Sequence, residues 1–205
     1  MQKKNKIVCF WWGNWCGKYG PKYVDRLYNS VLKHTTLPFE FYCMTDRPDL
    51  IKQNAIKFNP RFKWNLNKLL VFEQNFDLND RIITIDLDTV FMDNIDFILA
   101  DNSQFIVNES FGDRGQCGGG IVSTTYKYGR LLLNKLIKNY ETIEAQTKGS
   151  ERFFYRKYVT TPKFWQRKYS GIYSYKKHCQ KGVPKDAKIV HYHGRPRPHE
   201  VMEDF

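Results

Sequence analysis

The feature that most constrains this chain is a short apolar segment that ends in two acidic residues. Residues 81–85 read Arg-Ile-Ile-Thr-Ile and run directly into Asp86, Leu87 and Asp88. A run of this kind predicts a strand that is covered on both faces, as in a parallel sheet between helices. Because alternate residues of an extended chain point to the same side, we expect both carboxylates to lie together at the end of this strand.

Two close carboxylates at the end of an apolar strand need a partner that neutralises them. A divalent cation with oxygen ligands, Mn²⁺ or Mg²⁺, meets this need and can bridge to phosphate groups. The sequence therefore predicts that Asp86 and Asp88 bind a metal ion. The alternative is that Asp86 caps a turn and that Asp88 is simply solvated.

The order of the surrounding segments predicts the fold. Helices are expected over residues 22–34, 65–76 and 128–140, and a glycine-rich loop follows the strand at 105–107. The other expected strands are residues 7–12, 39–45, 121–123 and 188–192. Such alternation favours the α/β class, with a mostly parallel central sheet flanked by helices. In sheets of this type ligands bind outside the carboxyl ends of the strands, near the point where strand order reverses.

Composition narrows the class of protein further. A chain of 205 residues fits one ordinary domain, and no apolar run approaches the roughly 18 residues of a membrane span. The five cysteines are scattered without a Cys-x-x-Cys pair, which favours reduced thiols and a cytoplasmic location. The net charge of +12 suits nucleic acid, an anionic membrane or glycan surface, or nucleotide diphosphates, or else it is a solvated face.

A second cluster of chemically active residues occupies positions 191–198. His191 could complete the coordination of an ion, and Gly194 would let the backbone approach a phosphate closely. Arg195 and Arg197 could donate charged hydrogen bonds to a diphosphate. The alternative for His191 is a core histidine with satisfied hydrogen bonds.

These segments together resemble a known family. Residues 67–69, 81–90 and 94–96 resemble glycogenin and the related galactosyltransferases of glycosyltransferase family eight. Residues 172–176, 183–184 and 189–198 are similar to small bacterial and viral glycosyltransferases, so that the resemblance covers about residues 6–198. It implies a single GT-A, Rossmann-like domain over residues 1–205, a nucleotide-diphosphate-sugar donor, most often a UDP-sugar, and Mn²⁺ or Mg²⁺.

The resemblance also implies roles for individual residues. Asp86 and Asp88 would bind the metal with His191 as the third ligand, and Lys68 would reach the donor sugar or phosphate. The remaining donor contacts would come from Leu87, Gly194, Arg195 and Arg197, and from Phe10, Trp11, Trp12 and Tyr19 around the base. Either tryptophan could stack on the base or pack in the core.

Two departures from the family pattern concern the donor sugar. Where relatives carry Asn-Ser-Gly, residues 117–120 read Cys-Gly-Gly-Gly, so Gly118, Gly119 and Gly120 could offer only backbone contacts. Where relatives carry Asp-Gln, this chain has Ser150-Glu151-Arg152. Glu151 would then act as a sugar contact or acid–base group, or it would be an ordinary surface carboxylate.

The sequence thus predicts a metal-dependent glycosyltransferase that acts on a glycan, lipid or protein acceptor. Glu109 or Glu151 would act as base in an inverting reaction, and the leaving phosphate in a retaining one. The basic, aromatic region 145–181, with Trp165, Tyr169 and Lys176, is the expected acceptor side or a membrane-surface contact. Alternatives are a nucleic-acid-binding module, a sugar-nucleotide hydrolase or phosphotransferase, and a scaffold that binds donor without transfer.

Overall fold

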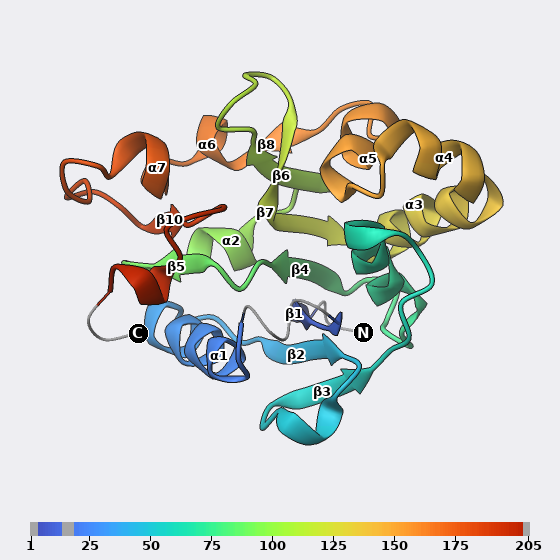
Figure 1. Ribbon diagram of the computed structural model, residues 1–205, viewed down its shortest axis with the longest axis horizontal. Helices are drawn as coiled ribbons and strands as arrows, with labels where there is room; N and C mark the ends of the chain where they lie inside the picture. Colours follow the sequence, from blue (N-terminus) through green and yellow to red (C-terminus); the bar gives the residue numbers. More distant parts are fainter. Residues whose placement is uncertain (1–3, 14–18, 203–205) are drawn as a thin grey trace.

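The segment that ends at Asp86 is strand β4 (Arg81–Ile85), in the middle of a seven-stranded sheet of the computed structural model (Figure 1). The structure describes residues 4–13 and 19–202. The strand order is β3-β2-β1-β4-β7-β6-β8. The other strands are β1 (Asn5–Trp11), β2 (Glu40–Thr45), β3 (Asn54–Lys57), β6 (Phe105–Glu109), β7 (Cys117–Thr125) and β8 (Lys163–Phe164). Strand β7 is antiparallel to β4 and β6, and all other neighbours are parallel. The predicted α/β class with a mostly parallel sheet is confirmed.

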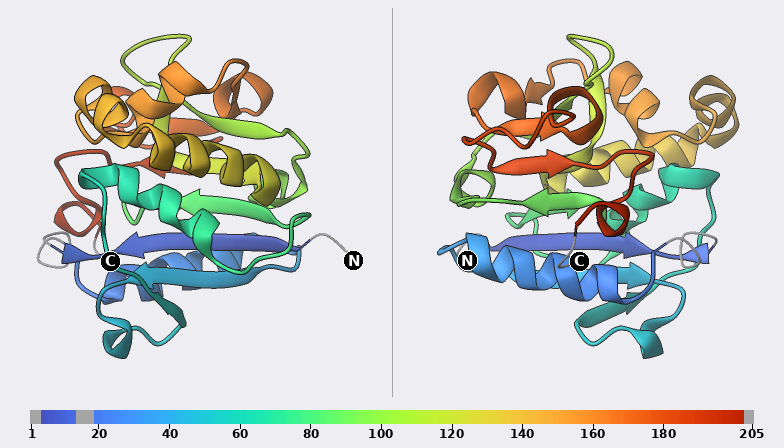
Figure 2. Two further views of the ribbon diagram at one scale, coloured as in Figure 1. Left: turned by 90° about the vertical axis from the view of Figure 1, so that its right-hand side faces the viewer. Right: turned by 60° about the vertical axis from the view of Figure 1, so that its left-hand side comes forward.

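Helices cover both faces of this sheet, because side chains alternate along its strands. One buried cluster contains Val8 and Phe10 of β1 together with Trp12, the residue after the strand. The other cluster contains Ile7, Cys9 and Trp11. Figure 2 (left) shows the 3-10 helix η3 (Trp64–Glu73) and α3 (Tyr126–Lys138) in front of the sheet and α1 (Lys22–His34) behind it. The remaining helices are α2 (Asp96–Ala100), α4 (Tyr140–Thr147), α5 (Glu151–Tyr158), α6 (Trp165–Lys168), α7 (Tyr175–His178), η2 (Pro48–Leu50) and η4 (Pro198–Glu200).

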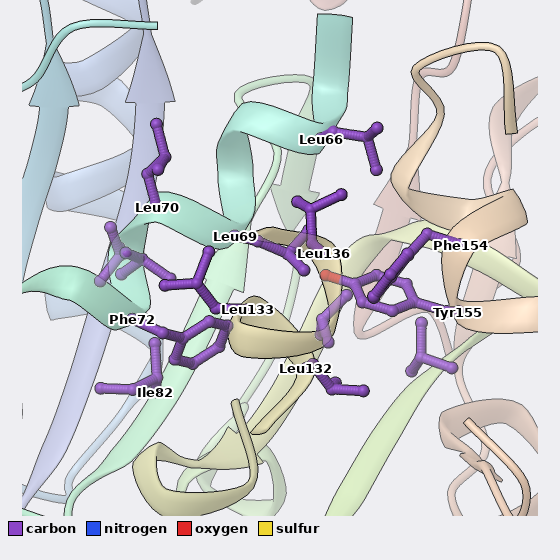
Figure 3. Packing of buried hydrophobic residues seen from close by; sticks show 14 of the residues in the cluster. Leu66, Leu69, Leu70, Phe72, Ile82, Leu132, Leu133, Leu136, Phe154 and Tyr155 are labelled. Carbon is purple, nitrogen blue, oxygen red and sulfur yellow. The ribbon is translucent and has the colours of Figure 1, made fainter. Parts of the chain in front are cut away.

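The cluster in front of the sheet joins η3 and α3 through close packing (Figure 3). Leu69 and Phe72 of η3 meet Leu132 and Leu136 of α3 in this cluster. At Gly129 of α3 a Cβ atom would lie only 2.1 Å from the ring of Phe72, so glycine is required for the two elements to approach. This contact places the whole of η3, including Lys68, firmly against the sheet.

Strand order reverses between β1 and β4. After β1 the chain passes through α1 to β2 and then β3 on one side, whereas β4 pairs with the other edge of β1. The carboxyl ends of β1 and β4 therefore flank the crevice in which α/β proteins commonly bind ligands. Asp86 follows β4 directly at this point.

A second sheet of three strands lies beside the central one, in the order β5 (Thr89–Phe91), β10 (Ile189–His191) and β9 (Ile172–Ser174). The strand predicted at 188–192 is thus present, but it pairs with β5 and β9. The two sheets touch where Gly120 of β7 lies against His191 of β10. Within the central sheet the Gly120 carbonyl accepts a hydrogen bond from the Asp86 N–H at 2.8 Å. A Cβ at Gly120 would lie 2.9 Å from the ring of His191 and 2.8 Å from the Asn108 amide nitrogen.

The helix predicted over residues 65–76 is a 3-10 helix that begins and ends earlier, at Trp64 and Glu73. The Asn67 side chain explains why an α-helix does not start here. Its oxygen accepts from the N–H groups of Arg61 and Phe62, and its nitrogen donates to the carbonyls of Phe62 and Trp64. A side chain that bonds to nearby backbone groups in this way competes with helical hydrogen bonds.

Three local expectations differ from the structure. Residues 117–120 are not a loop, because they form the start of β7, where Cys117 pairs with Glu109 of β6. The side chains of Leu131 and Ile137 in α3 do not face the hydrophobic core, since they are 60% and 46% exposed. The region 145–181, which shows no regular period, contains the end of α4, the helices α5 to α7, and the short strands β8 and β9.

Candidate functional site

Two adjoining cavities open at the carboxyl ends of β1 and β4. The inner cavity has a volume of about 280 Å³ and the outer cavity about 520 Å³. Asn65, Asp86, Asp88 and His193 line both. The two aspartates predicted from the sequence therefore stand at the junction of the cavities.

The inner cavity has one apolar wall. It is lined there by Phe10, Trp12, Tyr19 and Leu87, and the Trp12 ring meets Phe10 edge-on at 5.9 Å between centroids. Trp11 does not line the cavity, because adjacent residues of an extended chain face opposite sides; it is 2% exposed in the core cluster behind the sheet. Phe10, Trp12 and Tyr19 thus lie in the cavity where base contacts were predicted, and the prediction is wrong for Trp11. Residues 14–18 of the loop lie outside the described residues.

Lys68 holds two carboxylates at the junction. Its ammonium lies 2.5 Å from an Asp86 oxygen and 2.9 Å from a Glu151 oxygen. Burial works against the charged form of Lys68, but the two carboxylates outweigh it and raise the pKa of the amine. Glu151 itself is 5% exposed and lines the outer cavity, so the alternative of an ordinary surface carboxylate is wrong.

Asp88 is held from the opposite side. Its carboxylate accepts hydrogen bonds from the Tyr19 hydroxyl at 3.3 Å and from Arg197 at 3.2 Å, and the Arg197 guanidinium lies 4.8 Å from the centre of the Tyr19 ring. Burial, and then the negative charge of Asp86, raise the pKa of Asp88 to about 7. A cation beside the two aspartates would relieve their mutual repulsion.

The chemistry of the aspartate pair fits a divalent cation. Mg²⁺ commonly takes only one or two carboxylates and fills its remaining positions with phosphate oxygens and water. Across residues 4–13 and 19–202, however, no group of three or more His, Cys, Asp or Glu side chains is placed to hold a metal ion. The fit is therefore to Asp86 and Asp88, and His191 as a third ligand stays a prediction.

His191 lines the outer cavity but already has hydrogen-bond partners. Its Nε2 lies 2.8 Å from the Asn108 amide nitrogen, and its Nδ1 lies 3.2 Å from the Thr89 hydroxyl. Burial lowers the pKa of His191 to about 4, so the ring is neutral and offers one donor and one acceptor. Binding of a metal by Nε2 would require Asn108 to move away.

The outer cavity has a polar wall made by β7 and by the loop before it. Gly118, Gly119 and Gly120 line it, in agreement with the predicted backbone contacts. Glu109 also lines it, but its carboxylate is 2.5 Å from the Arg167 guanidinium. That ion pair lowers the pKa of Glu109, which makes Glu109 a poorer base than a solvated glutamate.

Region 145–181 contributes different residues to the site from those expected. Trp165 is 1% exposed and Tyr169 packs against the same core cluster, so the acceptor prediction is wrong for these two. Phe154 and Tyr155 are also buried, and buried rings cannot stack on nucleic-acid bases. Arg152 and Lys177 are the cations of this region that line the outer cavity.

The segment after β10 divides between cavity and solvent. Gly194 and Arg197 line the inner cavity. The side chain of Arg195 is 85% exposed and pairs with Glu200 at 3.2 Å. The predicted diphosphate contact by Arg195 is therefore wrong, since the chain turns that side chain away from the site.

Among the lining residues to which sequence reasoning gave no role are Asn65, Phe111 and His193. Asn65 precedes Lys68 by three residues, and in a 3-10 helix residues three apart lie on the same side. His193 follows His191 by two residues, which places both on one side of an extended chain. The ring of His193 stacks on Phe111 with centroids 5.8 Å apart and an angle of 8°, a contact with no local signal in the sequence.

No protein-family model matches this chain, and no curated protein matches it either. In the parts of the chain that the structure describes, no helix is both long enough and apolar enough to cross a membrane. An assignment of function therefore rests on the geometry and chemistry of the two cavities.

Proposed function

We propose that this protein is a metal-dependent glycosyltransferase that transfers a sugar from a nucleotide-diphosphate sugar, with a UDP-sugar as the first choice, to a glycan, lipid or protein acceptor. The observation that carries the proposal is the meeting of two cavities at Asp86 and Asp88. The donor consists of an apolar base, a charged diphosphate and a polar sugar. The inner cavity, the junction and the outer cavity offer surfaces of matching character in the same order.

The base would lie in the inner cavity. Phe10, Trp12 and Tyr19 provide ring surface there, and aromatic rings stabilise bases by stacking. The Trp12 ring is fixed by edge contacts with Phe10 and with Phe58, the latter at 5.6 Å between centroids. A ring that is already ordered loses little conformational entropy when a ligand binds.

The diphosphate would lie at the junction. A divalent ion held by Asp86 and Asp88 would supply positive charge to the leaving diphosphate. Arg197 would donate charge-assisted hydrogen bonds to the same group, and the Gly194 backbone lines the cavity beside it. Groups that are in place before the reaction stabilise developing charge without rearrangement.

The transferred sugar would face the outer cavity. Glu151 lines this cavity and pairs with Lys68 of the inner cavity, and the backbone of residues 118–120 lines the outer cavity as well. We assign Glu151 to contact the sugar or to accept the proton of the acceptor hydroxyl. Glu109 is the weaker candidate for this base because Arg167 holds its carboxylate.

Nucleotide binding tests the proposal. UDP, GDP, CMP and ADP are added with and without Mn²⁺ to the wild type, to Asp88→Asn and to Asp93→Asn, an exposed control, and thermal unfolding is followed. We expect one nucleotide to stabilise the wild type only with Mn²⁺, by about 2.7 kcal/mol at a hundredfold excess over its Kd. Asp88→Asn should lose this effect and Asp93→Asn should keep it. If no nucleotide stabilises the wild type, the proposal fails.

A further inference from the structure

The carboxylates in the walls of the two cavities all have cationic partners. Five acidic residues line one or both cavities. The ion pairs are Asp86–Lys68 at 2.5 Å, Glu151–Lys68 at 2.9 Å, Asp88–Arg197 at 3.2 Å, Glu109–Arg167 at 2.5 Å and Asp113–Arg156 at 3.0 Å. Four cations of the chain, of which Lys68 is shared, therefore pair with all five carboxylates.

Three cations beside the same cavities are not balanced in this way. Arg152 of α5 and Lys177 of α7 line the outer cavity. Lys176 Nζ lies 2.6 Å from the position of a Cβ on Gly194, which lines the inner cavity. Within residues 4–13 and 19–202, none of the three forms an ion pair with a carboxylate.

Two of these cations share a cavity wall with His193. This histidine lines both cavities, and its Nε2 is 2.7 Å from the Ser174 hydroxyl. Arg152 of α5 and Lys177 of α7 line the outer cavity with it, so two separate helices bring cations to the same cavity.

We propose that Arg152, Lys176 and Lys177 form a binding site for an anionic group, phosphate or carboxylate, carried by the acceptor. The inference rests on the proposed function, because it is the acceptor that would occupy the outer cavity. A guanidinium and two ammonium groups match the charge and the several acceptor oxygens of such an anion. An acceptor without charge would offer these cations no anionic partner.

The position of the cations favours the acceptor over the donor diphosphate. Arg152 and Lys177 line the outer cavity and not the inner one, whereas Lys176, next to Lys177 in α7, lies beside Gly194 of the inner cavity. The junction already holds Arg197 and the aspartate pair, which suffice for a diphosphate with its ion. Phe111, stacked on His193 in the outer cavity, adds a ring face against which a sugar of the acceptor can pack.

Calorimetric titration with inorganic phosphate tests the site without any nucleotide. The proteins are wild type, the double variant Arg152→Ala/Lys177→Ala, and the double control Lys157→Ala/Lys181→Ala, which removes exposed cations outside both cavities. We expect the first double variant to weaken phosphate binding by about ten- to a hundredfold, the effect of one or more charged hydrogen bonds. The control should stay within about twofold at constant salt. No phosphate binding to wild type, or equal losses in both variants, would overturn the proposal.

A second titration separates acceptor from donor. Phosphate is added to protein saturated with UDP and Mg²⁺, and UDP affinity is measured for each variant. We expect phosphate to bind the loaded protein and the Arg152/Lys177 variant to keep its UDP affinity. Competition between phosphate and UDP, with loss of UDP affinity in this variant, would assign the cations to the donor and overturn the proposal. If phosphate binds through these cations but no nucleotide binds, the anion site stands and the glycosyltransferase function fails.

Discussion

The inner and outer cavities share a wall but differ in how their charges are arranged. In the inner cavity the two cations, Lys68 and Arg197, pair with the two acidic residues, Asp86 and Asp88. At the outer cavity every acidic residue pairs with a cation, while Arg152 and Lys177 form no ion pair with a carboxylate of the described residues. The inner cavity is therefore organised by the chain alone, which suits a constant ligand such as a nucleotide diphosphate. The outer cavity has Arg152 and Lys177 in its wall, which is why we propose an anionic group on its ligand.

The largest expected effect concerns the cation that organises the inner cavity. Replacing Lys68 with Met leaves Asp86 and Glu151 close together without their shared partner, and breaking a buried ion pair from one side costs about 3–5 kcal/mol. Urea unfolding should show this loss in the free energy of unfolding. Lys63→Met is the matched control, because Lys63 pairs with Glu144 at the surface and such pairs contribute less than about 1 kcal/mol. Equal losses in both variants would mean that the junction is not organised by Lys68.

The next effect compares the two glutamates of the outer cavity. Glu151→Gln should lower kcat by about a hundredfold, the smaller end of what a general base contributes. Glu109→Gln should leave kcat close to wild type, because its carboxylate serves to hold Arg167 and the Gly115 N–H. Turnover of the donor that binds best provides the measurement. A larger loss for Glu109→Gln would exchange the roles of the two residues.

Asp101 is a paired carboxylate outside both cavities, and it serves as a reference for the effect of an ion pair on stability. Burial works against the charged form of Asp101, but hydrogen bonds from Lys168, the Ser103 N–H and Tyr169 outweigh it and lower the pKa of Asp101 to about 2. Because the folded pKa is below the unfolded one, this stabilisation is complete above about pH 4 and is lost as the pH falls towards 2.

Asp101→Asn should therefore cost about 2 kcal/mol at pH 7 and much less at pH 2.5. Unfolding by urea at the two pH values measures the difference. A cost that is the same at both values would show that the charge of Asp101 contributes nothing to stability.

The smallest expected effect separates the two faces of β1 at the inner cavity. Trp12→Leu should weaken nucleotide binding by on the order of 1 kcal/mol through lost stacking. Trp11→Phe should lower stability by creating space in the core behind the sheet while nucleotide affinity stays unchanged. Calorimetry with the nucleotide selected by thermal unfolding makes the comparison. If Trp11→Phe weakened nucleotide binding and Trp12→Leu did not, the assignment of Trp12 to the wall of the inner cavity would be contradicted.

The central part of the fold could be predicted because its signals are local. An apolar run followed by Asp86 and Asp88 places two carboxylates at a strand end whatever the rest of the chain does. The 3-10 form of η3 could not be predicted from the sequence, since it follows from hydrogen bonds between the Asn67 side chain and backbone groups as far away as residue 61. Residues 117–120 looked like a loop because glycine weakens strands. They belong to β7 because Cys117 pairs with Glu109 of β6 and the Gly120 carbonyl accepts a hydrogen bond from the Asp86 N–H.

The outer cavity was harder to predict than the inner one for the same reason. Its residues come from distant elements: Phe111 precedes β7, Arg152 belongs to α5 and Lys177 to α7. No spacing along the chain connects these positions. What could be seen from sequence was the excess of basic residues, and only the fold shows which of them lack an acidic neighbour.

The close contact at Gly120 limits which amino acids this position accepts. Any other amino acid would place an atom within 3 Å of His191 and Asn108, and so would push the two sheets apart. A library of random variants would therefore score codon 120 as intolerant, alongside the codons for Asp86 and Asp88. Its intolerance would reflect this close packing as well as its place in the wall of the outer cavity, and a survey of inactive clones alone would not separate the two effects.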